Sequence, residues 1–301
     1  MTRQDVRAAL AGLCSLIVLG FLASMACGAT FVDDLGRRVA IDEHPQRIIS
    51  LAPNITETLF ALGLDSRIVG VSLFSNYPKG ASRKPRVGNF INPSLERIVA
   101  LSPDLVIATA NGTRKETVLQ LERMGIVTYV IAPREFEDIF MMIRDLGGIT
   151  GREQEALALT EDLRRRVDRV KARTKDREMP RVFLQIGINP LVSVGKDTIH
   201  NRLITLAGGI NIFGDVDIAY PRVSIERVIA KGPDIIIMTD MRRGGGFARE
   251  QDKWRQWTDI PAVRNGRIYV IDSDVADRFS PRIVDGLEAL AGIIHPEVMK
   301  Q

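Results

Sequence analysis

The stretch SLERIVALSPDLVI at residues 94–107 returns later in the chain as SIERVIAKGPDIII at residues 224–237. Serine, glutamate, arginine, alanine, proline and aspartate recur in register, and most other positions exchange one aliphatic residue for another. The serine can cap a short helix, and the acid two residues later lies in the first turn, where the helix dipole favours it. The proline ends the helix, and the aliphatic run that follows suits a buried parallel strand. The two halves of the chain therefore share one supersecondary unit, half of a βαβ motif.

The same alternation of strand and helix continues through the rest of the chain. Residues 47–51 suit a strand, and residues 54–62 suit a helix that Gly63 would end. Asn54 and Glu57 have the spacing of a capping box at the start of that helix. Further strands are predicted at residues 68–72, 127–131, 181–186 and 267–271. Since roughly 300 residues normally divide into two domains, the pattern predicts an α/β fold of two Rossmann-like lobes with parallel sheets.

One segment between the two copies of the repeat is predicted to be a single long helix. Residues 153–177 carry an apolar stripe on an otherwise charged sequence, formed by Ala156, Leu159, Leu163, Val167 and Val170. A helix of that length would span about 40 Å, enough to cross from one lobe to the other. Thr150 and Glu153 can cap its start, and Met179 with Pro180 marks the beginning of the next strand series. We therefore expect one long rigid helix to join the lobes, although a helix of this kind also suits the outside of a single α/β domain.

The chain begins with the layout of a secretory leader. Arg3 and Arg7 precede an apolar run over residues 8–26, which small residues follow. Cleavage after Ala26 and cleavage after Ala29 both fit. The run also approaches the ~20 residues of a membrane-spanning helix, so a membrane anchor remains an alternative. The predicted organisation is a signal peptide at residues 1–29, an N-terminal α/β lobe at 30–150, a linking helix at 151–178 and a C-terminal α/β lobe at 179–301.

Both cysteines of the chain, Cys14 and Cys27, lie within this leader. An exported chain starting near Thr30 therefore has no thiol for a disulfide, a Cys-ligated metal or a nucleophile. Cys27 is also a site at which a lipid could be attached, although Ser24 stands three residues before it, where a lipoprotein signal usually has leucine. The expected location is periplasmic, with a lipid anchor at Cys27 as an alternative.

Composition and motifs argue against nucleic-acid binding and against an enzyme. The formal net charge is only +4, and basic residues are mixed with acidic ones, as in residues 161–175, so no stripe for phosphates is present. A Gly-Xaa-Ser-Xaa-Gly elbow, a phosphate-binding loop and a dinucleotide fingerprint are all absent. The three histidines, His44, His200 and His295, stand far apart in sequence. We therefore predict no catalytic residue, no cofactor and no metal site.

Several motifs, taken together, point to one protein family. They are DLGR at residues 34–37, SLAPNITE at 50–57, LERI at 95–98 with PD at 103–104, IPAV at 260–263, GRIY at 266–269, FLQIGINP at 183–190, YPRVS at 220–224 and RFSPR at 278–282. On these motifs the chain resembles the helix-linked class of periplasmic binding proteins, which serve ABC importers of cobalamin, haem and iron siderophores. The last three motifs are most similar to the cobalamin branch. The resemblance covers essentially the whole chain after the leader.

This resemblance implies two kinds of partner. A small ligand is expected between the lobes, and an ABC permease dimer of the inner membrane is expected to receive it. In the family, one acidic residue on each lobe docks onto arginines of the permease, and the matching residues here are Glu96 and Glu226. The internal repeat singles out the same pair, and two equivalent carboxylates suit a dimeric permease. Stabilisation of the helix dipole alone is the other explanation for both acids.

The ligand-binding residues are expected in loops that follow parallel strands, because ligands lie outside the carboxyl ends of such strands. Aromatic, amide and charged side chains gather in these loops. The predicted ligand-binding residues are Phe74, Tyr77, Phe90, Asn111, Gly187, Asn189, Tyr220, Asp277 and Arg278. For a corrinoid such as cobalamin, flat aromatic faces could pack on the macrocycle while amides and charges meet its polar rim.

Two other ligands fit the same family. Tyr77 and Tyr220 could serve as axial ligands of a haem. An anionic siderophore would favour cationic partners, and Arg278 with Arg222 or Arg282 could provide them. An exported α/β enzyme is the remaining alternative of another class.

Overall fold

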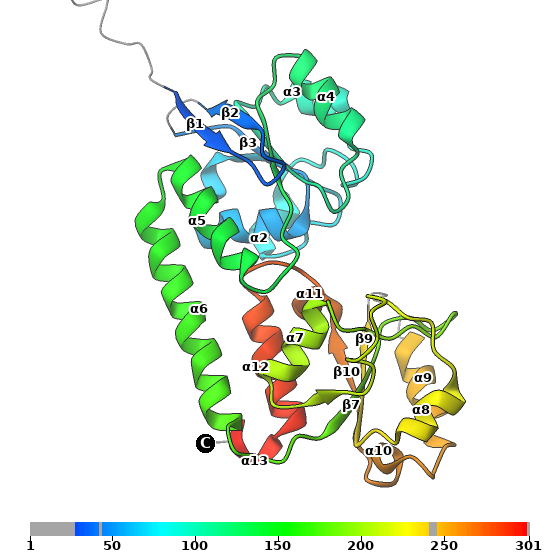
Figure 1. Ribbon diagram of the computed structural model, residues 1–301. Coiled ribbons are helices and arrows are strands. Elements are labelled where there is room, and N and C mark those ends of the chain that lie inside the picture. Colours follow the sequence, from blue (N-terminus) through cyan, green and yellow to red (C-terminus); the bar gives the residue numbers. More distant parts are fainter. Residues whose placement is uncertain (1–27, 42–43, 241–245, 300–301) are drawn as a thin grey trace, which may run out of the picture.

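The computed structural model describes residues 28–41, 44–240 and 246–299, so the leader predicted for residues 1–29 lies almost wholly outside the described residues. Two α/β lobes lie one above the other, and one long helix runs alongside both (Figure 1). The predicted fold class is confirmed. Within the described ranges, no helix is both long enough and apolar enough to cross a membrane.

The N-terminal lobe is built on a four-stranded parallel sheet in the order β4-β3-β5-β6, beside an antiparallel hairpin of β1 and β2. Its strands are β1 (Ala29–Val32), β2 (Arg38–Ile41), β3 (Ile48–Ser50), β4 (Ile68–Val71), β5 (Leu105–Thr109) and β6 (Thr128–Ile131). Its α-helices are α2 (Pro53–Ala61), α3 (Leu95–Ala100), α4 (Lys115–Arg123) and α5 (Asp138–Thr150), and short 3-10 turns cover Asp65–Arg67 and Lys79–Arg83.

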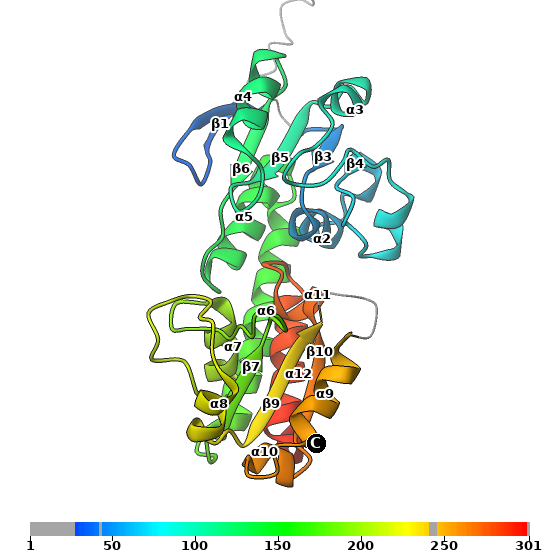
Figure 2. The same cartoon turned by 90° about the vertical axis from the view of Figure 1, so that its right-hand side faces the viewer.

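The C-terminal lobe repeats this topology, with a parallel sheet in the order β8-β7-β9-β10 (Figure 2). Its strands are β7 (Arg181–Gln185), β8 (Ile210–Asn211), β9 (Ile235–Asp240) and β10 (Ile268–Asp272). Its helices are α7 (Ile199–Leu206), α8 (Ile225–Lys231), α9 (Gly246–Arg255), α10 (Pro261–Arg264), α11 (Ser273–Ala276), α12 (Ile283–Ile294) and α13 (Pro296–Met299). All the strands expected from the sequence are present within two residues of their predicted ends.

The repeated sequence folds into the same capped helix in each lobe. Ser94 precedes α3, and its hydroxyl accepts a hydrogen bond from the backbone amide of Arg97 at 3.3 Å. Ser224 precedes α8 and accepts from the amide of Arg227 at the same distance. The two predicted caps are therefore confirmed, and each satisfies one of the amide groups that a helix start leaves without a partner.

A second shared device closes the other end of both helices. The guanidinium of Arg47, just before β3, donates to the carbonyls of Leu101 and Ser102, while Arg181 at the start of β7 donates to the carbonyl of Lys231. In each lobe the aspartate of the repeated proline-aspartate pair accepts from the backbone amide of that arginine. Each arginine thus ties the end of a helix to the start of a neighbouring strand.

The linking helix α6 (Glu153–Thr174) contacts α5 of the first lobe and α12 of the second. It is shorter than the predicted residues 153–177 because Lys175, with a ψ of 139°, is no longer helical and Asp176 has a positive φ of 61°. The predicted caps are wrong at two helices. The residue before α6 is Arg152, which makes no side-chain cap, and the hydroxyl of Thr150 bonds back to the carbonyl of Leu146. The helix α2 starts after Ala52, so Asn54 and Glu57 form no capping box.

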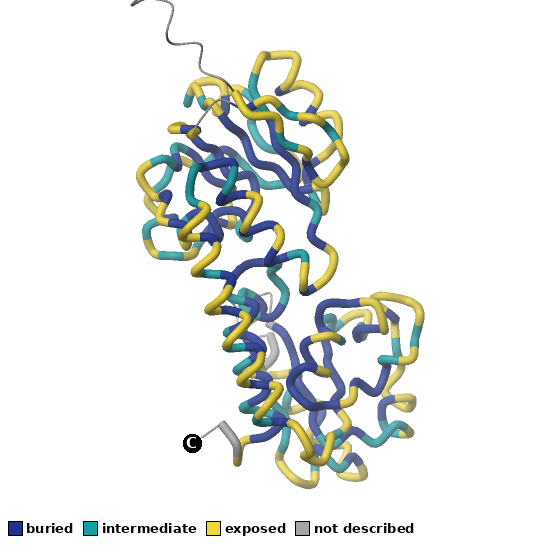
Figure 3. Tube along the Cα trace, turned by 60° about the vertical axis from the view of Figure 1, so that its left-hand side comes forward, coloured by how far each residue is buried: buried dark blue, intermediate teal, exposed yellow. Residues whose placement is uncertain are grey.

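One hydrophobic core runs through both lobes along α6. It joins apolar residues of α2 and α5 to those of α6, α7 and α12. Smaller clusters fill the opposite faces of the two sheets, under α3 and α4 in the first lobe and under α8, α9 and α10 in the second. The buried chain accordingly continues through the waist of the molecule, while exposed residues cover the outside (Figure 3). Because this core is shared, the two lobes pack against each other through α6 and are not independent domains on a flexible linker.

The side chain of Arg166 fastens α6 to the C-terminal lobe. Its guanidinium donates to Glu288 at 2.6 and 3.0 Å and to Asp285 at 2.6 Å, and these carboxylates raise the pKa of Arg166. We expect Arg166→Ala to lower the free energy of unfolding by about 1–3 kcal/mol, since both acids lose a charged partner. Denaturant unfolding measures this. Arg165→Ala is the matched control, because Arg165 is 63% exposed and its single pair with Asp162 is worth less than about 0.5 kcal/mol. Equal effects of the two changes would contradict the fastening role.

Candidate functional site

A hollow of about 260 Å³ lies between the lobes, at the carboxyl ends of the parallel strands. The N-terminal lobe contributes the segment after β3, the end of β5 and the loop after it, and Phe90. The C-terminal lobe contributes the segment between α11 and α12. The lining residues are Ala52, Pro53, Asn54, Phe90, Thr109, Asn111, Asp277, Arg278 and Phe279. The structure thus brings together four of the residues predicted to bind ligand, namely Phe90, Asn111, Asp277 and Arg278.

Exposed aromatic side chains stand close to this hollow on both lobes. Phe74 is 51% exposed, and its ring packs edge-to-face on Phe90 with 6.2 Å between ring centroids. Tyr77 is 46% exposed on the first lobe, and Tyr220 is 51% exposed on the second. Large apolar side chains are costly to leave in water, and grouped exposed aromatics of this kind mark binding surfaces.

Tyr220 belongs to a small polar cluster with His200 and Asp277. Its ring meets that of His200 edge-to-face, 6.2 Å between centroids, and Nε2 of the buried His200 lies 2.9 Å from Oδ1 of Asp277. Burial, and then the nearby carboxylate of Asp277, raise the pKa of the Tyr220 phenol. The phenol therefore stays protonated at neutral pH. Nδ1 of His200 is buried without a hydrogen-bond partner among the described residues.

A second hollow, of about 360 Å³, also lies between the lobes. One wall is the segment from β6 to α5, and the other is the start of α7 with the loop before it. Three basic and three acidic side chains line it, together with Phe136, Thr198 and Ile199: Arg134, Lys196 and Arg202, and Glu135, Glu137 and Asp197. The sequence-based prediction missed this charged part of the cleft. Arg134 follows a predicted strand and could have been found by the same rule, whereas Lys196 follows a long loop after β7 and gave no signal.

Glu96 and Glu226 occupy equivalent exposed positions, each in the first turn of a capped helix. For Glu226, hydrogen bonds to its own backbone amide and to Ser224 lower the pKa of the carboxyl, so the group is fully ionised at neutral pH. Both side chains are exposed, so each can meet the surface of a partner.

Comparison with known proteins identifies the family. A model described as "Periplasmic binding protein" matches residues 48–275. The vitamin B12-binding protein of Vibrio parahaemolyticus is 31% identical over 247 residues, which are 82% of this chain and 88% of that protein. The chain belongs to the periplasmic binding protein family.

Two further proteins are similar to this chain. An uncharacterized ABC transporter substrate-binding lipoprotein of Bacillus subtilis, YvrC, is 30% identical over 279 residues, 90% of this chain and 87% of that protein. The periplasmic haem-binding protein RhuT from Roseiflexus sp. RS-1, in its apo form, has a TM-score of 0.75 and 27% identity, and the match covers 85% of this chain and 99% of RhuT. The resemblance found in the sequence is confirmed. This periplasmic binding protein is accordingly a substrate-binding component of an ABC system. Its family consists of extracytoplasmic transport proteins and not of enzymes.

Three of the predicted ligand-binding residues have other structural contacts. The guanidinium of Arg278 is held by Glu57, Asn76 and Asp274, so its charge is balanced within the protein. Gly187 and Asn189 lie in a turn that bridges to Val192, and they line neither of the two interlobe hollows.

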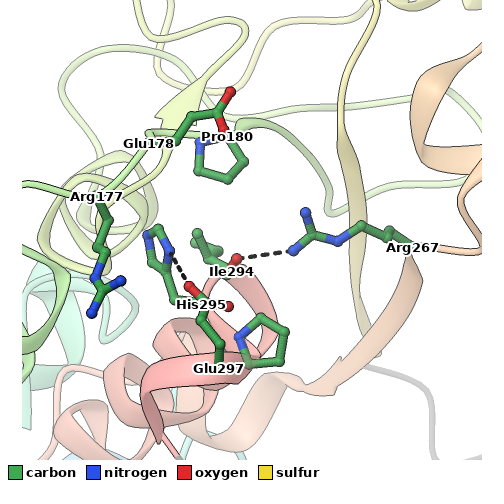
Figure 4. A pocket seen from close by; sticks show the side chains of 8 residues that line it. Arg177, Glu178, Pro180, Arg267, Ile294, His295 and Glu297 are labelled. Carbon is green, nitrogen blue, oxygen red and sulfur yellow. Dashed lines mark hydrogen bonds and ion pairs between the residues drawn. The ribbon is translucent and has the colours of Figure 1, made fainter.

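A third hollow, of about 450 Å³, lies at the opposite end of the C-terminal lobe, near the starts of β7 and β10 (Figure 4). Its polar groups serve the end of α12. Arg267 donates to the carbonyls of Ile293 and Ile294, and the ring of His295 meets the carbonyl of Gly208 and the carboxylate of Glu297. These contacts satisfy carbonyls that a helix end leaves without partners, so the hollow is explained by capping. Over the part of the chain that is described, no group of three or more His, Cys, Asp or Glu side chains could hold a metal ion.

Proposed function

We propose that this binding protein captures a corrinoid, cobalamin, in the interlobe cleft and delivers it to an ABC permease. The observation that carries the proposal is the set of exposed aromatic rings, Phe74 and Tyr77 on one lobe and Tyr220 on the other, beside a cleft with polar and charged walls. A corrin ring offers flat apolar faces and a rim of amides, which are the two chemistries that these side chains match. The similarity to vitamin B12-binding proteins supports the same ligand.

Calorimetric titration of the exported chain with cyanocobalamin tests this proposal. We expect saturable one-to-one binding with a Kd of roughly micromolar or tighter, because two or three buried rings contribute about 1.5–3 kcal/mol each. Haem and a ferric hydroxamate siderophore are titrated under the same conditions. If haem or the siderophore binds and cobalamin does not, that compound is the ligand and the corrinoid proposal is wrong. If none of the three gives a heat of binding, the protein binds a different class of ligand.

Haem is the second candidate, and the exposed phenols of Tyr77 and Tyr220 favour it. A tyrosine that ligates haem iron does so as phenolate. Burial and Asp277 raise the pKa of Tyr220, which opposes that role and leaves Tyr77 as the better axial ligand. A siderophore has less support, because Arg278 is bound by acids and the guanidinium of Arg282 lies 3.9 Å from the ring centroid of Tyr77.

Docking to the permease is proposed to use Glu96 and Glu226. Their matched, exposed positions at the starts of α3 and α8 place one carboxylate on each lobe. A pair of arginine clusters related by the symmetry of a permease dimer would complement them. The proposal also includes export, directed by a leader at residues 1–29, and a lipid on Cys27 would add an anchor. The exported part is proposed to consist of an N-terminal lobe at 30–150, a linking helix at 151–178 and a C-terminal lobe at 179–301.

A further inference from the structure

One buried carboxylate of the N-terminal lobe is bonded entirely to the C-terminal lobe. The side chain of Glu57, on α2, is only 2% exposed. Its Oε1 accepts from the guanidinium of Arg278 at 2.7 Å, and its Oε2 accepts from the hydroxyl of Ser280 at 2.6 Å. Both partners belong to the segment between α11 and α12, and Figures 1 and 2 show this segment below α2. The contact therefore crosses the space between the lobes at the floor of the cleft.

Arg278 carries the contact further into both lobes. Its Nη1 also donates to Oδ1 of Asn76 at 2.9 Å, and its Nη2 pairs with Asp274 at 2.5 Å. Asn76 in turn donates to Asp274 at 2.8 Å. We call the set of Glu57, Asn76, Asp274, Arg278 and Ser280 the interlobe clamp. It joins two segments of the first lobe to two segments of the second, and Arg282, whose guanidinium lies over the ring of Tyr77 and 3.5 Å from Glu57, extends it.

The segment that presents Asn76 is held firmly within its own lobe. Buried hydroxyls form a chain from Ser50 through Thr56 and Ser75 to Ser72, with oxygen distances of 2.7 to 2.8 Å. Arg86 donates to the carbonyls of Ser72 and Ser75. A contact between segments fixed in this way transmits force between the lobes, whereas a contact between loose loops would not.

The clamp carries an energetic cost that simple packing would not require. Burial raises the pKa of Glu57, while the bonds from Ser280 and Arg278 act in the opposite direction. Burying an ion pair is often no more stabilising than filling the same space with apolar side chains, but removing one partner leaves an uncompensated charge. A pair of this kind makes one arrangement specific, because only the matched position of the two lobes gives the buried carboxylate of Glu57 its charged partner.

We propose that the interlobe clamp is a second tether between the lobes, which together with α6 sets their separation before any ligand arrives, and that Glu57 is the positioning residue at its centre. The helix α6 attaches the lobes along one side through α5 and α12, and the clamp attaches them at the cleft floor. With both α6 and the interlobe clamp in place, the lobes cannot make relative motions that α6 alone would allow. The clamp also fixes Asp277 and Phe279, the neighbours of Arg278, as walls of the cleft. The proposal does not depend on which ligand binds.

The test measures the distance between the lobes without a ligand. Spin labels are placed at the exposed residues Gln120 of α4 and Gln256 after α9, in a full-length chain that carries Cys14→Ser and Cys27→Ser so that no native thiol competes. Pulsed electron paramagnetic resonance then gives the distribution of distances between the two labels. We expect one narrow population for the unaltered clamp. Glu57→Ala should shift the equilibrium toward an open arrangement on the order of 100-fold, because it removes the charged interlobe partner of Arg278 and the acceptor of Ser280, and leaves only the amide of Asn76.

Matched variants separate a tether from a general loss of stability. Asp33→Asn removes the charge of another buried carboxylate, one that pairs with Arg37 inside a single lobe, and should leave the distance distribution unchanged. Ser280→Ala removes only one hydroxyl from Glu57 and should produce a smaller shift in the same direction. If Glu57→Ala does not fold, Ser280→Ala decides the question. An unchanged distribution in a folded Glu57→Ala or Ser280→Ala variant, or an equal shift in Asp33→Asn, would overturn the proposal. Failure of cobalamin to bind would not affect it.

Discussion

Replacing Glu96 and Glu226 together with alanine is expected to abolish transport while leaving ligand affinity unchanged. Both carboxylates are exposed on the lobes, and neither lines the interlobe hollows. Each lost charge pair should weaken docking to the permease by roughly 30-fold, and two losses that act independently would multiply to on the order of 1,000-fold. Docking would then fail at ordinary concentrations of the binding protein.

The measurement is uptake of labelled cobalamin into vesicles that contain the reconstituted permease, with calorimetry as the check on affinity. Glu116→Ala with Asp252→Ala is the matched control, since it removes one exposed acid from each lobe, at α4 and α9. The control should transport normally. Because Ser94 and Ser224 keep their own caps, the test variant should remain folded. Normal uptake by the Glu96 and Glu226 double variant would exclude the docking role.

The fold was predictable because it repeats a local pattern that can be read without tertiary contacts. Ser94 and Ser224 cap helices, a proline follows the end of each helix, and aliphatic runs form buried parallel strands, all within segments of 14 residues. The capping arginines were not predictable. Arg47 and Arg181 act on carbonyls about 50 residues away in sequence, and nothing local distinguishes them from other surface arginines.

For the candidate site, the sequence predicted which residues meet at one interlobe hollow better than it predicted their contacts. The rule for the ends of parallel strands placed Phe90, Asn111 and Asp277 on one hollow, because it depends only on sheet topology. Glu57 shows the limit of that reasoning. Its spacing from Asn54 suggested a local capping box, yet its carboxylate bonds to residues more than 220 positions later. The carboxylate of Glu57 could bond to a nearby backbone amide or to residues of the other lobe. Only the packing of the two lobes decides between these alternatives.

The double change of Phe74→Ala and Tyr220→Ala is expected to cause the largest loss of ligand affinity. One ring comes from each lobe, and each is about half exposed to solvent. Covering such a ring with ligand contributes about 1.5–3 kcal/mol, so each truncation should weaken binding roughly 10- to 100-fold. Tyr77 is less suitable for this test, because its ring contacts Arg282 at the edge of the interlobe clamp.

Calorimetry with cyanocobalamin measures the loss, and Trp257→Ala is the control. Trp257 is an aromatic residue that is 36% exposed and lies between α9 and α10; α10 is at the end of the C-terminal lobe farthest from the N-terminal lobe (Figure 1), so removal of Trp257 should not change affinity. Tyr220→Phe separates packing from chemistry at the same position. It keeps the ring and should retain corrinoid affinity within about twofold, because the protonated phenol contributes mainly its apolar face. A large loss in Tyr220→Phe would show that the hydroxyl itself contacts the ligand. Unchanged affinity in the double alanine variant would show that the rings of Phe74 and Tyr220 do not bind the ligand. The charged hollow beside Arg134 and Lys196 would then be the place where the ligand is recognised.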